Sequence, residues 1–346
     1  MSLILSGIFS GILYVVLAAL SKIGSRASVI LAISLPIGVL LPEVISKNLL
    51  PYLPHIIVGL ITVAMIRVNL GRVVHHLSRP IILCASLILL MVIMPLGMNW
   101  LAGFLALSLP LHMALVFMVC APPLGSAPNL AYLLKLDAEL VFNITIAGTL
   151  VLPLIAPLMV SVTLGNSMSF DSWALFSRLL ITVGVSIFLA ALTRKVLGQK
   201  RIKANGGALD GLSALIMVLF VVAAMGGVSR ILETNPIQVL YLLGIVLLAN
   251  FGAQVFFSFL GMMIEKVYPG VSRRQSLSFG MVAGNRNLGL FAAAIPLANL
   301  EQILPFLALY QVPIYLTPMV GGLFYRYFLN RSSTPTVSGY VTLIMP

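Results

Sequence analysis

The chain has 346 residues, of which 60% are hydrophobic and only 8% are charged, and its net charge is +12. Soluble domains carry roughly 25% charged residues, so this composition excludes an ordinary soluble protein and predicts helices that face lipid. The basic residues lie in short loops between apolar runs, with no interleaved aromatic residues. This pattern favours membrane topology over nucleic-acid binding as their role.

The first apolar stretch, Ser2 to Leu20, has no basic residues before it, and Lys22 and Arg26 follow it. A cleaved signal peptide is therefore not expected. The stretch is either an additional span or a helix that lies on the membrane surface, so residues 1–28 form a separate N-terminal segment in this interpretation.

Ten further apolar runs follow, each long enough for a tilted transmembrane helix. The sequence therefore predicts an all-α polytopic membrane protein with about ten transmembrane helices. The runs are residues 29–46, 55–72, 81–100, 107–134, 138–165, 173–193, 208–229, 237–264, 276–297 and 303–326.

Lysine and arginine residues are concentrated in every second gap between the apolar runs. When the gaps are numbered alternately from the one that holds Lys22, 16 basic residues fall in odd gaps and 3 in even gaps, with Arg286 left inside a run. Because basic loops remain in the cytoplasm, the odd gaps and the tail 331–346 are predicted to be cytoplasmic. We expect a multi-pass protein of a bacterial inner membrane with a cytoplasmic C-terminus.

A polar break near residues 164–172 divides the ten runs into two groups of five. An odd number of spans in each group inverts the second group in the membrane relative to the first, as in transporters built from inverted repeats. We therefore expect one five-helix repeat at 29–166 and a second at 167–330.

Two runs, the fourth of each group, contain interruptions. The first has three prolines and a glycine between Cys120 and Asn129, which cannot form an unbroken helix. The second reads Gly-Asn-Arg-Asn-Leu-Gly from Gly284 to Gly289. Paired breaks at matching positions of two inverted halves indicate the binding site of a secondary transporter. For either break alone, a kink relieved by neighbouring helices is the alternative.

Polar residues elsewhere within the runs extend this candidate site. Asn250 and Gln254 are four residues apart and share a helix face, with hydrogen bonding between helices as the alternative role. Tyr310, Gln311 and Tyr315 are expected to line a path. No catalytic residue, cofactor or metal ion is predicted. The predicted substrate-binding residues are Pro123, Gly125, Ser126, Asn129, Asn143, Thr145, Asn250, Gln254, Gly284, Asn285, Arg286 and Asn287.

Several of these stretches resemble the bile acid/sodium symporter family. Residues 122–133 are similar to the family segment Cys-Pro-Gly-Gly-Thr-x-Ser-Asn with a following Tyr-Leu, and residues 148–158 to Ser-Thr-Leu-Leu-x-Pro-Leu-x-Thr-Pro-Leu. Arg286 to Leu290 stand where the family has Gln-Asn-Ser-Gly-Leu.

The resemblance implies the fold of the bacterial apical sodium-dependent bile acid transporters, with broken helices 4 and 9 crossing in a core domain. The panel domain would comprise about 29–72 and 173–229, and the core about 81–165 and 237–328.

The sequence departs from this family where the resemblance places sodium ligands. A Glu and a Gln of the family match Val282 and Arg286, a second Gln matches Leu90, and a Ser-Asn pair matches residues 128–129, of which only the Asn is kept. A guanidinium stays protonated at any working pH. Arg286 is expected to replace sodium as a fixed cation, to bind a carboxylate or sulfate of the substrate, or to cap carbonyls of the broken helices.

These observations predict a secondary transporter that moves a small organic anion by alternating access, without sodium coupling. Its partners would be the anion and the lipid bilayer, and no nucleic acid, and the open choices for energising transport are proton coupling, exchange for a counter-anion, or a uniport without coupling. The alternatives are an efflux carrier of the same fold with another cargo, of the arsenite or auxin type, or a membrane-embedded enzyme or sensor. An enzyme is not expected, because the sequence has no P-loop, no His-Glu-x-x-His and no paired intramembrane carboxylates.

Overall fold

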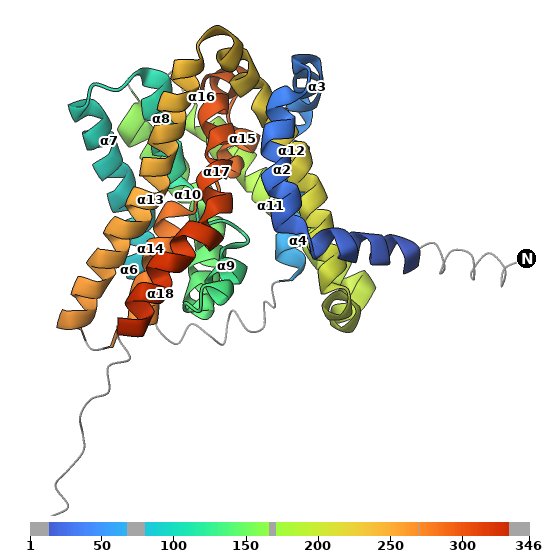
Figure 1. The fold of residues 1–346 in the computed structure, drawn as a ribbon. Helices are drawn as coiled ribbons and strands as arrows, with labels where there is room; N and C mark the ends of the chain where they lie inside the picture. Colours follow the sequence, from blue (N-terminus) through green and yellow to red (C-terminus); the bar gives the residue numbers. More distant parts are fainter. Residues whose placement is uncertain (1–13, 68–79, 166–170, 269, 332–346) are drawn as a thin grey trace, which may run out of the picture.

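The protein is a bundle of helices, most of which run along one common direction (Figure 1). A computed structural model describes residues 14–67, 80–165, 171–268 and 270–331. Within these ranges, 7 helices are long and apolar enough to cross a membrane, or up to 8 when the bent pair Tyr14–Gly24 and Val29–Leu40 counts as one span. The protein is therefore a multi-pass integral membrane protein.

The first half of the described chain contains three long helical units and one interrupted one. Residues 80–104 form a single helix with a π-helical turn in its middle. In this turn i→i+5 hydrogen bonds replace the i→i+4 bonds of the α-helix. In chain order the elements are α2 (Ala27–Leu40), α3 (Glu43–Leu49), η1 (Leu50–Tyr52), α4 (Leu53–Ile66), α6 (Pro80–Ile88), η2 (Leu89–Ile93), α7 (Met94–Phe104), α8 (Leu109–Cys120), α9 (Ala127–Leu133) and α10 (Ala138–Leu164).

The second half contains three helices of about 30 residues, an interrupted helix and a long C-terminal helical stretch. Its elements are α11 (Ser172–Ala204), α12 (Gly206–Thr234), α13 (Pro236–Val267), α14 (Arg273–Gly284), α15 (Gly289–Ala294), α16 (Leu297–Leu309), α17 (Gln311–Leu316), η3 (Thr317–Gly321) and α18 (Gly322–Arg331). The predicted spans at 29–46, 107–134 and 276–297 correspond to α2, α8–α9 and α14–α15, which are short or interrupted. The total of ten spans and the inverted repeat therefore stay predictions.

Both interruptions that the sequence predicts are confirmed. One helix ends at Cys120 and the next begins at Ala127, because the prolines that follow Ala121 have no N–H to continue the hydrogen-bond ladder. The other ends at Gly284 and resumes at Gly289, since Asn285 leaves the helical conformation with ψ at 85°. Each interruption leaves the polar groups of two helix ends inside the bundle.

The helix Tyr14–Gly24 is turned by 82° from the helix that follows it and runs sideways from the bundle (Figure 1). Its end packs closely on the start of α12, where a Cβ added to Gly211 would lie 1.9 Å from the carbonyl oxygen of Leu20. The expected N-terminal apolar stretch is only partly covered, because residues 1–13 lie outside the described residues.

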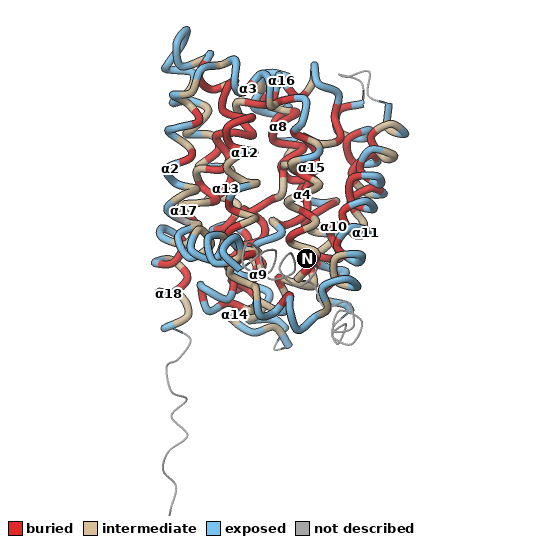
Figure 2. The backbone as a smooth tube through the Cα atoms, turned by 90° about the vertical axis from the view of Figure 1, so that its right-hand side faces the viewer, coloured by how far each residue is buried: buried red, intermediate tan, exposed pale blue. Residues whose placement is uncertain are grey.

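Buried residues concentrate along the central helices, and exposed ones face outward or lie at the ends (Figure 2). Every residue of α14 from Ser276 to Gly284 is buried, and this helix packs along α13 through small residues. A Cβ on Gly280 would lie 1.9 Å from Ser258 Oγ. Large apolar side chains such as Leu248 and Val267 remain exposed on the outside, as lipid-facing positions are.

Candidate functional site

The two interrupted helices meet at their interruptions. Leu124 N donates to Asn285 O at 3.0 Å, and Asn287 N donates to Pro122 O at 2.8 Å. Pro123 and Arg286 thereby form a short antiparallel bridge. Hydrogen bonds within the crossing thus use backbone groups that the broken helices leave free, which explains how unwound backbone is accommodated inside the bundle.

Arg286 stands at the centre of this crossing, and its side chain is fully buried. Its Nη2 donates to the carbonyl oxygens of Leu90 at 2.6 Å and Val119 at 2.9 Å, and lies 3.4 Å from Met94 Sδ. Leu90 belongs to the π-helical turn η2, and Val119 to the last turn of α8, where carbonyls lack helical partners. One guanidinium nitrogen of the second interruption therefore joins the 80–104 helix and α8.

The charge of Arg286 has no carboxylate partner among the ion pairs of the described residues. Its Nε and Nη1 atoms are buried and have no hydrogen-bond partner in the described part of the chain. A guanidinium at such depth is costly and is usually met by protein dipoles, water or an ionic partner. The carbonyls of Leu90 and Val119 supply part of this compensation and leave a net positive charge at the crossing.

A second polar network contacts the C-terminal end of α14 through residues that do not line a cavity with Arg286. Asn250 Nδ2 donates to Gly284 O at 2.6 Å, and the hydroxyl of Tyr310 donates to the same oxygen. Gln254 Nε2 donates to Asn250 Oδ1 at 2.6 Å and to Thr317 Oγ1 at 3.1 Å. The network satisfies the carbonyl at which α14 stops, as the rule for buried polar groups requires. Tyr325 OH and Asn285 Oδ1 extend it through Gln254 and Thr317.

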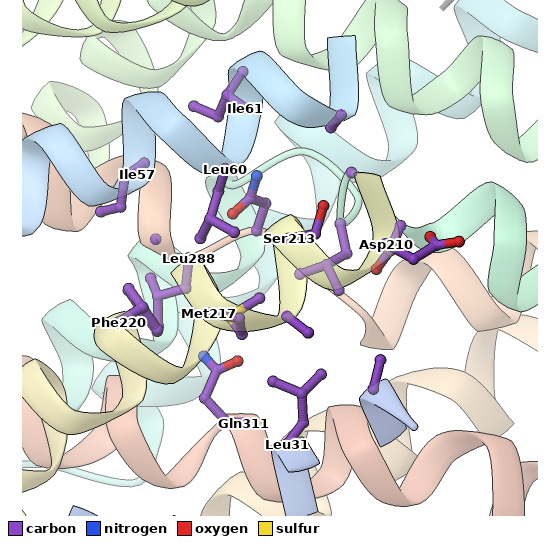
Figure 3. A pocket seen from close by; sticks show the side chains of 18 of the residues that line it. Leu31, Ile57, Leu60, Ile61, Asp210, Ser213, Met217, Phe220, Leu288 and Gln311 are labelled. Atoms are coloured by element: carbon purple, nitrogen blue, oxygen red, sulfur yellow. The ribbon is translucent and has the colours of Figure 1, made fainter. Parts of the chain in front are cut away.

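A cavity of about 280 Å³ lies beside the crossing, between α4 and α12 on one side and the interrupted segments on the other (Figure 3). It reaches from Asp210 near one end of α12 to Phe220 in the middle of the bundle. The residues that line it are Gly24, Ala27, Leu31, Ile57, Leu60, Ile61, Ala64, Met65, Leu124, Gly125, Ser126, Thr149, Asp210, Ser213, Ala214, Met217, Phe220, Arg286, Asn287, Leu288, Gly289 and Gln311.

The structure brings some of the predicted site residues together at this cavity and places others behind it. Gly125, Ser126, Arg286 and Asn287 line it. Asn129, Asn143 and Thr145 are not among its lining residues, and Pro123, Gly284, Asn285, Asn250 and Gln254 form the crossing and the network behind it. The hydroxyl of Thr145 donates to Val141 O within its own helix.

Three expectations for the C-terminal span have different outcomes. Gln311 lines the cavity, Tyr310 lies in the network behind the crossing, and Tyr315 does not line the cavity. The predicted set omitted Thr149, Ser213 and Asp210. A signal for the last two was present in the sequence, because Asp210, Ser213, Met217 and Phe220 recur at spacings of three and four and therefore share one helix face.

The chain also matches a known protein family. Residues 54–234, more than half of the chain, match the Sodium Bile acid symporter family. The chain belongs to this family. Among curated proteins, the uncharacterized protein YbaS of Bacillus subtilis (strain 168) is 26% identical over 188 residues, which are 53% of this chain and 61% of that protein. The match thus spans about three fifths of the relative's length.

The match to the Sodium Bile acid symporter family includes α4 and the first interruption, and it ends at Thr234. The second interruption, with Arg286, and the polar network of Asn250, Gln254 and Tyr310 lie beyond it. The family match therefore covers only the first interruption, and the roles of the residues around Arg286 rest on their own contacts.

Proposed function

We propose that the protein is a secondary transporter that moves a small organic anion by alternating access without sodium coupling. The observation that carries this proposal is the buried guanidinium of Arg286, which donates to carbonyls of two other helical segments at the crossing. A permanent internal cation at this place performs the charge-stabilising role that a bound cation would otherwise have. In this role Arg286 replaces sodium, and its contacts support the fixed-cation hypothesis together with carbonyl capping rather than direct binding of the substrate by the buried side chain.

Two positions at the crossing that would supply sodium ligands by the family resemblance lack a side-chain oxygen. A sodium ion takes several oxygen ligands, and the positions where the family resemblance places a Glu and a Gln are the buried Val282 and Leu90, which have no side-chain oxygen. The backbone oxygen of Leu90 already accepts from Arg286. A monovalent cation would also be repelled by the guanidinium at short range in a medium of low dielectric constant.

The same charge favours an anionic substrate. Arg286, whose side chain is fully buried, lies at the cavity wall, and the only acidic side chain among the described lining residues, Asp210, lies at the cavity's end and pairs with Arg67. The carbonyl dipoles compensate the guanidinium only in part, so its charge adds a positive contribution to the potential in the cavity. An organic carboxylate or sulfate with an apolar body would match both this potential and the apolar wall on α4.

The position of the cavity supports alternating access from one side. Its lining extends to Gly24, at the end of the helix Tyr14–Gly24, and to Asp210, near the start of α12, and we take this end as the open one. At the other end, a Cβ on Gly227 of α12 would lie 3.3 Å from Pro305 of α16, so these helices are in close contact. The charge distribution makes the open end cytoplasmic, which corresponds to an inward-facing state in a bacterial inner membrane.

The antiparallel pairing of the two interruptions supports the ten-span inverted repeat, with repeats at 29–166 and 167–330. Segments related by inversion run in opposite directions where they cross, as Pro123 and Arg286 do. In this arrangement α2, α4, α11 and α12 form the panel, and the remaining helices form the core that moves against it. An arsenite-type cargo receives no support, because the buried Cys120 does not line the cavity.

Reconstituted proteoliposomes test the proposal. Purified protein is first screened by thermal shift against a series of three- to six-carbon carboxylates and their sulfonate analogues, and the stabilising anions are then used, radiolabelled, in uptake assays. We expect uptake to be equal in sodium chloride and in choline chloride of the same ionic strength. Uptake that rises steeply with sodium concentration would defeat the proposal, as would the absence of anion uptake under any gradient.

A further inference from the structure

The cavity has two walls of different chemistry. Helix α4 contributes an entirely apolar stripe of Ile57, Leu60, Ile61 and Ala64. The opposite wall combines the interruptions with α17 and presents hydroxyl and amide groups from Ser126, Asn287 and Gln311. A ligand that fills the cavity therefore has one apolar side and one side with several polar groups.

Gln311 is the most deeply placed of these polar groups. It is 4% exposed and, in Figure 3, its amide points into the cavity toward α12. Its Nε2 donates to Leu307 O at 3.3 Å, and because a carbonyl requires a donor, this bond fixes which side of the amide is nitrogen. Its Oε1 accepts no hydrogen bond from the described residues. An acceptor that faces the cavity without a protein partner is available to a donor that comes from the ligand.

Ser213 on α12 is a second unused group in the cavity. Its hydroxyl has no hydrogen-bond partner among the described residues. Most buried hydroxyls in these helices instead bond to the carbonyl four residues earlier, which removes them from recognition. Those that do so include Thr145, Thr149, Thr182, Ser186 and Thr317. Ser213 is half-buried and makes no such bond, which leaves its hydroxyl free to contact a ligand from the panel side.

The size of the cavity limits the ligand. Its volume of about 280 Å³ is at or below the range of roughly 300–1,000 Å³ for sites that hold drug-sized ligands. A metabolite with a short carbon skeleton fits this space in the inward-facing state, with its apolar face on α4.

We propose that Gln311 is a specificity-determining residue that selects small organic anions carrying a hydroxyl group, which donates a hydrogen bond to Oε1. The inference rests on the proposed function, because it adds a second polar group to the anion that Arg286 favours. The Oε1 atom of Gln311 distinguishes ligands that can donate a hydrogen bond from ligands that can only accept one. A hydroxy acid satisfies Oε1, whereas a keto acid of the same skeleton and the unsubstituted acid leave it unpaired. Ser213 contributes a weaker contact to the same polar side of the ligand.

A matched series of five-carbon acids tests this selection. The probes are 3-methylbutanoate, its 2-hydroxy and 3-hydroxy derivatives, and 2-oxo-3-methylbutanoate, with dissociation constants measured by calorimetry on the purified full chain. We expect at least one hydroxy acid to bind about tenfold more tightly than both the unsubstituted and the oxo acid, as one additional hydrogen bond predicts. Gln311→Met, which keeps the side-chain length, should reduce this ratio to about twofold or less.

Two variants complete the design. Gln238→Leu changes an exposed glutamine outside the cavity and should keep the wild-type ratio. Ser213→Ala should lower the ratio by a smaller factor than Gln311→Met does, and it keeps the test available if the latter variant does not fold. Equal binding of all four acids by the wild type, or an unchanged ratio in a folded Gln311→Met protein, would overturn the inference while leaving the proposed function intact. Failure of the wild type to bind or transport any anion would contradict the proposed function itself.

Discussion

Nη2 of Arg286 lies 2.6 Å from the carbonyl oxygen of Leu90, within the π-helical turn of the 80–104 helix. A π-helical turn shifts the hydrogen-bond register and leaves a carbonyl without its usual α-helical partner. The guanidinium satisfies that carbonyl and, at the same time, the Val119 carbonyl near the end of α8. The irregular turn, the helix end and the cation are thus complementary features of one crossing.

Replacing this cation should affect transport more than stability. Arg286→Met removes a buried charge, which relieves a desolvation cost of several kcal/mol, but it orphans two carbonyls at about 1–3 kcal/mol each. Because these terms oppose each other, we expect the melting temperature to change by only a few degrees. Anion uptake in proteoliposomes should fall at least about tenfold, since the charge that favours the anion is lost.

Arg286→Lys is the matched control, because it keeps the charge with a shorter reach and fewer donors. Its uptake should lie between that of the wild type and that of Arg286→Met. Wild-type uptake by the methionine variant would reduce Arg286 to a structural residue.

The sequence was sufficient for the interruptions but insufficient for the cavity. Prolines after Ala121 and the polar run from Gly284 exclude continuous helices through local chemistry, so both breaks could be predicted without tertiary information. The partners of Arg286 could not, because Leu90 and Val119 contribute backbone oxygens, which every residue has. Asn250 and Gln254 were correctly placed on one face, yet only packing shows that this face meets the end of α14 and lies behind the cavity.

The carbonyl of Gly284 accepts from both Asn250 and Tyr310, and this shared acceptor predicts non-additive stability effects. Either Asn250→Ala or Tyr310→Phe leaves one donor in place and should cost about 1–2 kcal/mol. The double variant leaves the buried oxygen unpaired and should cost more than the sum of the two. Thermal unfolding of all four proteins in detergent measures the coupling. Additivity within about 0.5 kcal/mol would show that the two donors do not act on one carbonyl.

Close packing of α14 on α13 makes Gly280 intolerant of a side chain. A Cβ there would lie 1.9 Å from Ser258 Oγ and 2.5 Å from the backbone oxygen of Gln254, so the two helices would have to separate. Gly280→Ala should destabilise the protein by about 1–3 kcal/mol or more. Gly244→Ala on α13 is the control, since nothing lies within 4 Å of its Cβ, and it should be neutral or slightly stabilising. Equal melting temperatures for the two variants would contradict the tight contact.

At the open end of the cavity, Arg67 Nη1 lies 2.7 Å from Asp210 Oδ1, and its Nη2 donates to Gly206 O at 3.0 Å. Asp210 is the only carboxylate among the described residues that line the cavity, so Arg67 neutralises the charge in this lining that would repel an incoming anion. Both side chains are partly exposed, and an interaction of about 1 kcal/mol is appropriate for such a pair. Arg67→Gln should therefore raise the KM for anion entry from this side by about fivefold.

A double variant separates this electrostatic effect from a structural one. Asp210→Asn in the Arg67→Gln background removes the repelling charge and should return the KM to near the wild-type value. The effect of Arg67→Gln should also shrink in high salt, because the Debye length falls from about 10 Å at 0.1 M to about 3 Å at 1 M. Measurement requires uptake into inside-out vesicles at both ionic strengths. A KM that stays raised in the double variant would mean that Arg67 acts by holding Gly206 and the start of α12, rather than by its charge.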